Sequence, residues 1–145
     1  MKTILIALAA ISGNLGIDLD PKETKCIATA IYHEARGEPI MGQAAVGYVI
    51  NNRVFSERYP DTACGVVYQP WQFSHIKDAK PDYNSDAWKR AVQVAAFTQV
   101  GLIEDETEGA TMYYSHAVMN NPPKWDFSKL AFVGELQGHS FYSEK

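Results

Sequence analysis

The spacing of apolar residues changes once along this chain, and that change constrains the fold more than any other feature. Before Gly101, three segments have apolar residues at three- and four-residue intervals, which is typical of amphipathic helices. After Gly109, the apolar residues fall in short runs rich in aromatic and β-branched side chains, which favour strands. Helices followed by strands predict an α+β domain with a small β-sheet toward the C-terminus.

The first predicted helix has clear signals at both ends. Asp20 can cap it, Pro21 suits the first helical position, and Glu23 completes the pattern of a capping box. The helix is expected to end near Gly37–Pro39, because glycine and proline interrupt helical backbone.

Two further helices and three strands follow along the chain. A helical period over residues 41–54 predicts the second helix. The third is expected to begin at Asn84–Asp86, whose side chains can cap it, and to stop at Gly101. The chain between these two helices is expected to be rich in loops. The expected strands are 110–114, 130–133 and 138–142, with an irregular proline-containing loop at 120–125.

The composition fits one globular domain that does not bind nucleic acid. The chain has 145 residues, of which 46% are hydrophobic and 21% charged, which is enough to bury a core. Its formal net charge is -4 and its cations are scattered, whereas nucleic-acid binding needs clustered Lys and Arg. We therefore expect one domain over residues 20–145, preceded by an apolar segment at residues 1–19.

Residues 1–19 contain one Lys followed by the apolar run Ile4–Ile11. That run is too short to span a bilayer, so we expect no stable membrane insertion. Two interpretations stay open: a weak secretion signal cleaved near Ala10–Ser12, or a helix that packs on the domain.

Glu34 lies on the apolar face of the first predicted helix. It follows Ile27 by seven residues and Ala30 by four, so it continues the stripe that packs on the core. A carboxyl group there is either a structural acid held by hydrogen-bond donors or an acid whose pKa is raised by burial. Because the helix ends directly afterwards, and later segments rich in Tyr, His and Gln could converge there, we interpret Glu34 as a general acid.

Three segments carry motifs long enough to compare with known families: Tyr32–Glu38 (YHEARGE), Gly42–Val46 (GQAAV) and Asn52–Val54 (NRV). Together they resemble the core signature of the SleB/CwlJ-type cell-wall hydrolases, which include spore cortex-lytic enzymes. The resemblance covers roughly residues 26–142. Further landmarks in the same order are Pro60, Cys64–Val67, Gln72–Ser74, Tyr113–Tyr114, Trp125, Gly138–His139 and Phe141.

This resemblance implies a lysozyme-like α+β fold and action on the glycan strands of peptidoglycan, between N-acetylmuramic acid and N-acetylglucosamine. Glu34 takes the place of the family's catalytic acid. A lytic transglycosylase needs this one acid, whereas a muramidase would normally need a second carboxylate. We expect no cofactor, no metal, and a monomer that acts at the bacterial cell wall, in the periplasm or outside the cell, encoded by a bacterium or a phage.

Five residues are candidates for a substrate groove, in which polar groups would bond acetamido groups and aromatic rings would stack on sugar rings. They are Gln72, Phe73, Tyr113, Tyr114 and His116. For each aromatic residue, core packing is the alternative interpretation. The sequence departs from the family pattern at His75, at Ser115–His116 and at 119–123, which leaves the substrate preference open.

Three residues are expected to support the site rather than to react: Glu38, Arg36 and His139. Glu38 is expected to pair with Arg36 or Arg53, or to cap the next helix, because the helix break after Arg36 takes it off the face of Glu34. His139 is expected to hold the last strand through hydrogen bonds. The loop acids expected to be exposed turn residues are Asp61 and Asp78.

The two cysteines, Cys26 and Cys64, lack the Cys-x-x-Cys spacing of a zinc site. An even count fits one disulfide between the first helix and a later loop, formed in an oxidising compartment. Two buried free thiols fit the sequence as well, so both interpretations stay open.

Other functions compete with glycan cleavage. A metal-dependent hydrolase would use the four histidines, which are His33, His75, His116 and His139. However, His33 lacks a second His one helical turn later, as a zinc-binding helix needs, and Arg36 would repel the cation. The remaining alternatives are an amidase that cuts the stem peptide and a glycan-binding module without turnover.

Overall fold

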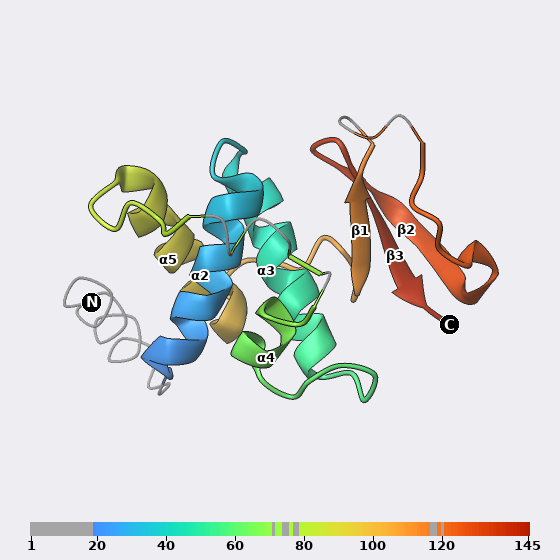
Figure 1. Ribbon diagram of the computed structural model, residues 1–145, viewed down its shortest axis with the longest axis horizontal. Coiled ribbons are helices and arrows are strands. Elements are labelled where there is room, and N and C mark those ends of the chain that lie inside the picture. Colours follow the sequence, from blue (N-terminus) through green and yellow to red (C-terminus); the bar gives the residue numbers. More distant parts are fainter. Residues whose placement is uncertain (1–18, 71, 74–75, 77–78, 117–118, 120) are drawn as a thin grey trace.

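The structure is a computed structural model that describes residues 19–70, 72–73, 76, 79–116, 119 and 121–145. Figure 1 shows the helices gathered on one side and a small sheet on the other. Helices precede strands along the chain, as the change in apolar spacing predicts. In the described ranges, no helix combines the length and the apolar character needed to cross a membrane. The expected signal or packing helix before Leu19 lies outside the described residues, as do His75 and Asp78.

Four α-helices are described: α2 (Pro21–Ala35), α3 (Ile40–Val54), α4 (Ala63–Val67) and α5 (Asp86–Val100). The Asp20 carboxylate accepts the Lys22 amide at the start of α2, and the Ser85 hydroxyl accepts the Trp88 amide at the start of α5. Gly101 ends α5 with φ 73°, a left-handed conformation that glycine adopts without strain. The predicted bounds of the three long helices are confirmed to within about two residues.

Helix α4 lies in the segment that the sequence predicts to be rich in loops, and the sequence pattern does not indicate this helix. The Thr62 hydroxyl caps α4 by accepting the Gly65 amide at 3.0 Å. Ala63, Val66 and Val67 of this helix are buried in the core. Five residues are too few to show a helical period, which is why the sequence pattern did not indicate a helix.

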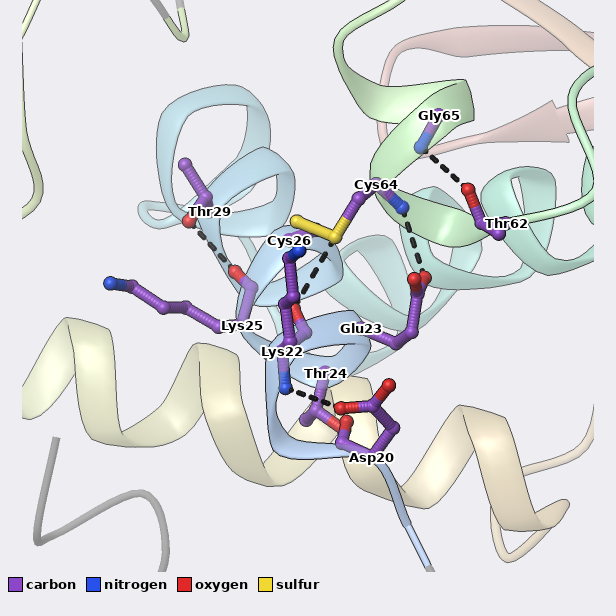
Figure 2. Close-up of a disulfide and its surroundings, with 10 residues drawn as sticks. All are labelled: Asp20, Lys22, Glu23, Thr24, Lys25, Cys26, Thr29, Thr62, Cys64 and Gly65. Carbon is purple, nitrogen blue, oxygen red and sulfur yellow. Dashed lines mark hydrogen bonds between the residues drawn. A yellow bond between two sulfur atoms is a disulfide. The ribbon is translucent and has the colours of Figure 1, made fainter.

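A disulfide joins α2 to α4 (Figure 2). It links Cys26 to Cys64, which are 38 residues apart in the chain and 5.1 Å apart between Cα atoms. Beside it, the Glu23 carboxylate accepts the Cys64 amide at 3.0 Å (Figure 2). The predicted capping box is therefore wrong, because Glu23 turns toward α4 and not toward the start of its own helix. Both contacts hold α4 against the first turns of α2.

The core lies between α2 and its neighbours α3, α4 and α5. Ile27, Ala30 and Ile31 of α2 have no exposed surface, which confirms the predicted apolar stripe. Trp88 and Val92 of α5 are buried in the same cluster. Burial of this stripe fixes the rotation of α2 about its axis, and so fixes the direction in which its last turn faces.

The sheet contains β1 (Met112–Ser115), β2 (Leu130–Leu136) and β3 (His139–Glu144), antiparallel in the order β1-β3-β2. A short 3-10 helix, η2 (Phe127–Lys129), leads into β2. The three predicted strands are confirmed, with later ends than predicted. Gln137 and Gly138 form the β2–β3 turn with φ 52° and 77°, as tight two-residue hairpins require.

The two faces of the sheet have different neighbours. Tyr113 pairs with Phe141 across β1 and β3, and both pack with Val49 of α3. Tyr114 pairs with Ser140 and points to the opposite side, because side chains alternate along a strand. We call the side toward α3 the inner face and the other side the outer face.

Candidate active site

Glu34 lies in the last turn of α2, one residue before that helix ends. The backbone turns there, because the Glu38 amide donates to the Ala35 carbonyl at 2.9 Å and Pro39 is the N-cap of α3. The Glu34 side chain is half-buried. The pKa of Tyr113 is raised first by burial and then by the negative charge of Glu34. The Glu34 carboxylate is therefore close enough to the inner face of the sheet to interact with Tyr113.

The phenol of Tyr113 stays protonated throughout the physiological pH range. Its pKa is raised by burial and by the carboxylates of Glu34 and Glu38, and the Arg53 guanidinium offsets part of that rise. A neutral phenol can donate a hydrogen bond to a carboxylate or to a ligand oxygen. The site therefore combines a carboxyl group with a neutral donor.

Arg53 of α3 is a buried cation beside Tyr113, with 5% of its surface exposed. Its Nε donates to the Thr111 carbonyl at 2.6 Å, and its guanidinium lies 5.0 Å from the ring centroid of Tyr59 and 5.6 Å from that of Phe73. Burial lowers the pKa of Arg53, whereas Tyr59 and Tyr113 raise it. Its Nη1 is buried and has no hydrogen-bond partner among the described residues. The guanidinium thus keeps a spare donor near the site.

The Glu38 carboxylate faces the imidazole of His139, which in turn contacts Tyr113. Glu38 Oε1 lies 3.6 Å from His139 Nδ1, and the imidazole stands edge-on to the Tyr113 ring at 5.4 Å between centroids. Burial raises the pKa of Glu38, and His139 lowers it in part. The Gln43 side-chain amide donates to the Glu38 carbonyl at 3.0 Å, which fixes the backbone at the start of α3.

Gly42 makes room for the Glu38 side chain. A Cβ atom at residue 42 would lie 2.5 Å from Glu38 Oε2 and 3.2 Å from Gln137 Cγ. The first of these separations is shorter than any carbon–oxygen van der Waals contact, so a side chain here would displace the carboxylate. The Gly42 position therefore brings α3, Glu38 and the β2–β3 turn close together.

The prediction that Glu38 pairs with an arginine or caps the next helix is wrong. The structure pairs it with His139, while the N-cap of α3 is Pro39 without a side-chain hydrogen bond. Arg36 is exposed, and it donates to the Tyr32 carbonyl at 3.1 Å with its guanidinium over the Tyr32 ring. His139 is predicted to hold the last strand through hydrogen bonds. Its Nδ1 lies 3.1 Å from the Gln137 carbonyl at the hairpin, which agrees with that prediction in part.

The structure separates the five candidate groove residues. Tyr113 lies beside Glu34, but the adjacent Tyr114 is on the outer face, where its ring stacks on Tyr142 at 6.2 Å. His116 follows it there, with Nδ1 3.0 Å from the Ser140 hydroxyl. One groove therefore does not contain Tyr113, Tyr114 and His116 together, because strand alternation divides them.

The two other candidates come from the segment after α4. Phe73 is buried in the helical core against Arg53, which favours the packing alternative for this ring. Gln72 is exposed in a turn, where its backbone amide donates to the backbone carbonyl of Gln69 at 3.4 Å. Asp61 is exposed before α4, as expected of a turn residue.

The described histidines lie in different surroundings. His33 is edge-on to Tyr32 at 5.4 Å, His139 faces Glu38, and His116 is on the outer face. Within the described ranges, no group of three or more His, Cys, Asp or Glu side chains is arranged to hold a metal ion.

Sequence reasoning did not predict that two polar residues of α3 are buried. Gln43 and Arg53 are 1% and 5% exposed. Both lie at helical intervals from the buried Val46 and Ile50, so they continue an apolar stripe in the way that Glu34 does on α2. That signal was available, because a polar residue on a buried stripe needs a partner or a function.

A family model described as cell wall hydrolase matches residues 37–142, which is more than half of the chain. The match begins just after Glu34. The spore cortex-lytic enzyme of Halalkalibacterium halodurans is 30% identical over 122 residues, which cover 84% of this chain and 36% of that protein. The spore cortex-lytic enzyme of Bacillus subtilis is 27% identical over 126 residues, which cover 87% and 40%. This chain thus spans less than half the length of these relatives.

Two solved structures have the same fold. The catalytic domain of the germination-specific lytic transglycosylase SleB from Bacillus anthracis superposes with a TM-score of 0.71 at 28% identity, covering 85% of this chain and 95% of that one. The catalytic domain of the Bacillus cereus SleB protein gives 0.66 at 30% identity, covering 86% and 91%. These likenesses confirm the predicted α+β fold and the resemblance carried by the YHEARGE motif. The chain belongs to the cell wall hydrolase family.

Proposed function

We propose that this chain cleaves the glycan strands of peptidoglycan, between N-acetylmuramic acid and N-acetylglucosamine, as a lytic transglycosylase with Glu34 as its catalytic acid. The observation that carries the proposal is the position of Glu34, in the last turn of α2 with its charge raising the pKa of Tyr113. Family membership supports the choice of substrate, because the relatives are described as spore cortex-lytic enzymes and as a lytic transglycosylase.

The proposed reaction uses one carboxyl group twice. Glu34 donates its proton to the glycosidic oxygen, the bond from that oxygen to C1 of the muramic residue breaks, and the glucosamine end leaves with a new hydroxyl. The Glu34 carboxylate then takes the proton of the muramic 6-hydroxyl, whose oxygen bonds to C1 and closes a 1,6-anhydro ring. No water is consumed, and Glu34 regains its proton.

The neighbours of Glu34 have supporting roles in this proposal. Tyr113 is a neutral donor suited to orienting the Glu34 carboxyl group or a substrate oxygen. Arg53 supplies a buried positive charge beside Tyr113, which stabilises negative charge that develops at the site. Gln72, which is exposed, stays a proposed contact to an acetamido group of the substrate.

A muramidase is the second candidate function, because a second carboxyl group, that of Glu38, also raises the pKa of Tyr113. Glu38 is partly buried, and burial raises its pKa. Glycosidases that use water place a second carboxylate at a set separation from the acid, either to activate the water or to form a covalent intermediate. If Glu38 had that role, the products would carry reducing ends and not anhydro rings.

Mass spectrometry of the products released from purified peptidoglycan tests these proposals. Wild-type protein should release muropeptides that end in anhydro-muramic acid. Glu34→Gln, which keeps the shape of the side chain but removes the proton, should lower release by about 10²–10⁴-fold. Glu38→Gln is the matched control and should still release anhydro products.

Each other outcome has a definite meaning. Reducing-end products that disappear in Glu38→Gln would establish the muramidase. New free amino groups without glycan fragments would indicate an amidase. Equal release by wild-type protein and by Glu34→Gln would show that Glu34 is structural, and the proposal would then be wrong.

The proposed setting is the bacterial cell wall, where peptidoglycan is found, with a monomer as the active form and no cofactor. Light scattering during size-exclusion chromatography measures the oligomeric state directly. Activity that rises with protein concentration in step with a dimer peak would contradict the monomer.

A further inference from the structure

A recess of about 240 Å³ lies at the end of the sheet remote from the β2–β3 hairpin. Its lining includes Met112 at the start of β1, Leu130 at the start of β2 and Glu144 at the end of β3, which the antiparallel register places at one end of the sheet. His139, which faces Glu38 at the candidate active site, begins β3 at the other end. The five-residue separation from His139 to Glu144 corresponds to about 16 Å along the strand. The recess is therefore distinct from the Glu34 site.

The apolar part of the recess is formed by Met112, Leu130 and the indole of Trp125. Trp125 is held by other aromatic rings of the outer face, so its orientation is fixed before any ligand arrives. These rings are Tyr114, Phe127 and Tyr142, with centroids 5.9, 6.0 and 6.4 Å from that of Trp125. A fixed and partly exposed indole presents a flat apolar surface at low entropic cost.

The polar part of the recess consists of two ion pairs with no net charge. Arg58 Nη1 lies 3.8 Å from Glu144 Oε1, and Lys129 Nζ lies 3.8 Å from Asp126 Oδ2. Both separations exceed hydrogen-bond distance. Glu144 Oε1 also accepts from the Tyr59 hydroxyl at 3.2 Å, so the capacity to bond a ligand lies mainly with Arg58, Lys129 and Asp126. Three of the four side chains are more than half exposed, at 56% for Arg58, 80% for Lys129 and 58% for Asp126. Strong donors and acceptors thus border the apolar floor.

We propose that this recess is a second carbohydrate site, which holds one pyranose ring of a glycan strand away from Glu34. A balanced set of charges suits a neutral ligand rich in hydroxyl groups, whereas an anion or a cation would meet one repulsive partner in each pair. The apolar face of a sugar ring fits a fixed indole. The volume is below the roughly 300–1,000 Å³ of pockets for drug-sized ligands, which matches a single ring. That the glycan is peptidoglycan rests on the proposed function.

Nuclear magnetic resonance of the unaltered protein tests the site without a mutation. The probe is chitotriose, the β-1,4-linked trimer of N-acetylglucosamine. Its addition should shift the indole N–H signal of Trp125 and the methyl signal of Met112 in a saturable way. The indole of Trp88, buried in α5, should not move. Chitotriose that leaves the Trp125 and Met112 signals in place while moving signals near Glu34 would overturn the proposal.

Sedimentation with insoluble peptidoglycan measures what the recess contributes to binding. The background is Glu34→Gln, which prevents digestion. Trp125→Ala in that background should weaken binding about two- to tenfold, as expected for loss of one ring stack. Phe55→Ala removes a ring that is 88% exposed and outside the recess, and it should bind like the background protein. Equal binding by folded Trp125→Ala would contradict the proposal.

Failure of this site and failure of the proposed function are distinguishable. If wild-type protein released no muropeptides but chitotriose still shifted Trp125, the carbohydrate site would stand and the catalytic proposal would not. Release of anhydro-muropeptides without any shift at Trp125 would have the opposite meaning.

Discussion

Tyr113 and Tyr114 are consecutive residues of β1, yet they lie in very different surroundings. On the inner face, Tyr113 meets charged groups: Glu34, Arg53 and Glu38 all change its pKa. On the outer face, Tyr114 meets rings, with Trp125 edge-on at 5.9 Å and Tyr142 stacked at 6.2 Å. Strand alternation alone therefore turns one sequence motif, Tyr-Tyr, into a charged site and an aromatic surface.

The comparison shows that the two faces would interact with a ligand through different forces. Charges on the inner face are partly removed from water, so their interactions with a ligand are strong and sensitive to single atoms. Rings on the outer face contribute through area and shape, so the loss of one polar atom there has little effect. Substitutions that remove single atoms separate these two behaviours.

Among substitutions that compare the two faces, the largest expected effect comes from removing the hydroxyl of each tyrosine in turn. Tyr113→Phe should lower kcat for glycan release about ten- to hundredfold, because the site loses the neutral donor that we propose orients the Glu34 carboxyl group or a substrate oxygen. Tyr114→Phe keeps its ring contacts and should leave kcat within about twofold of wild type. Product release measured at saturating peptidoglycan compares them. Similar losses in both variants would show that the faces do not differ as described.

Much of the inner face could be predicted from the sequence, because its main parts depend on local patterns. The capping residues Asp20 and Ser85 and the stop at Gly101 gave helix bounds close to those observed. The interval from Ile27 to Glu34 placed the acid on the buried stripe of α2. The separation of Tyr113 from Tyr114 was also within reach, since it follows from strand alternation.

Other parts required the tertiary structure. The Glu38–His139 pair joins residues that are far apart in the chain, and no local pattern indicates that contact. Glu23 fits a capping box by spacing, but the disulfide brings the Cys64 amide within its reach. Phe73 sits in a family landmark, and burial against Arg53 is what favours packing over sugar stacking.

A smaller effect is expected from adding one methyl group on the inner face. Gly42→Ala would place Cβ 2.5 Å from Glu38 Oε2, so the carboxylate or α3 has to move. The free energy of unfolding should fall by about 1–3 kcal/mol, as for other overpacked sites. Gly37→Ala is the matched control, because no heavy atom lies within 4 Å of the added Cβ. Urea denaturation measures both variants.

The double variant Gly42→Ala with Glu38→Ala identifies the cause of that loss. If the clash with the carboxylate is responsible, truncating Glu38 should recover most of the stability relative to Glu38→Ala alone. Additive losses would instead assign the effect to the contacts that remain, with Gln137 Cγ and Glu38 Cβ, each 3.2 Å from the added Cβ.

The smallest expected effect is a change in how stability depends on pH. Burial raises the pKa of Glu38 above its ordinary value of 4.5, with partial compensation from His139. A carboxyl group whose pKa is higher in the folded state binds more protons there, so its contribution to stability falls as pH rises from 4.5 through the folded-state pKa.

Glu38→Gln should therefore be more stable relative to wild type at pH 7 than at pH 4. Glu135→Gln, on the exposed outer face near His116, is the control variant. Urea denaturation at both pH values measures the difference. Because Glu38 also acts on Tyr113, a gain in stability without a change in kcat would mean that its charge matters to the fold and not to the reaction.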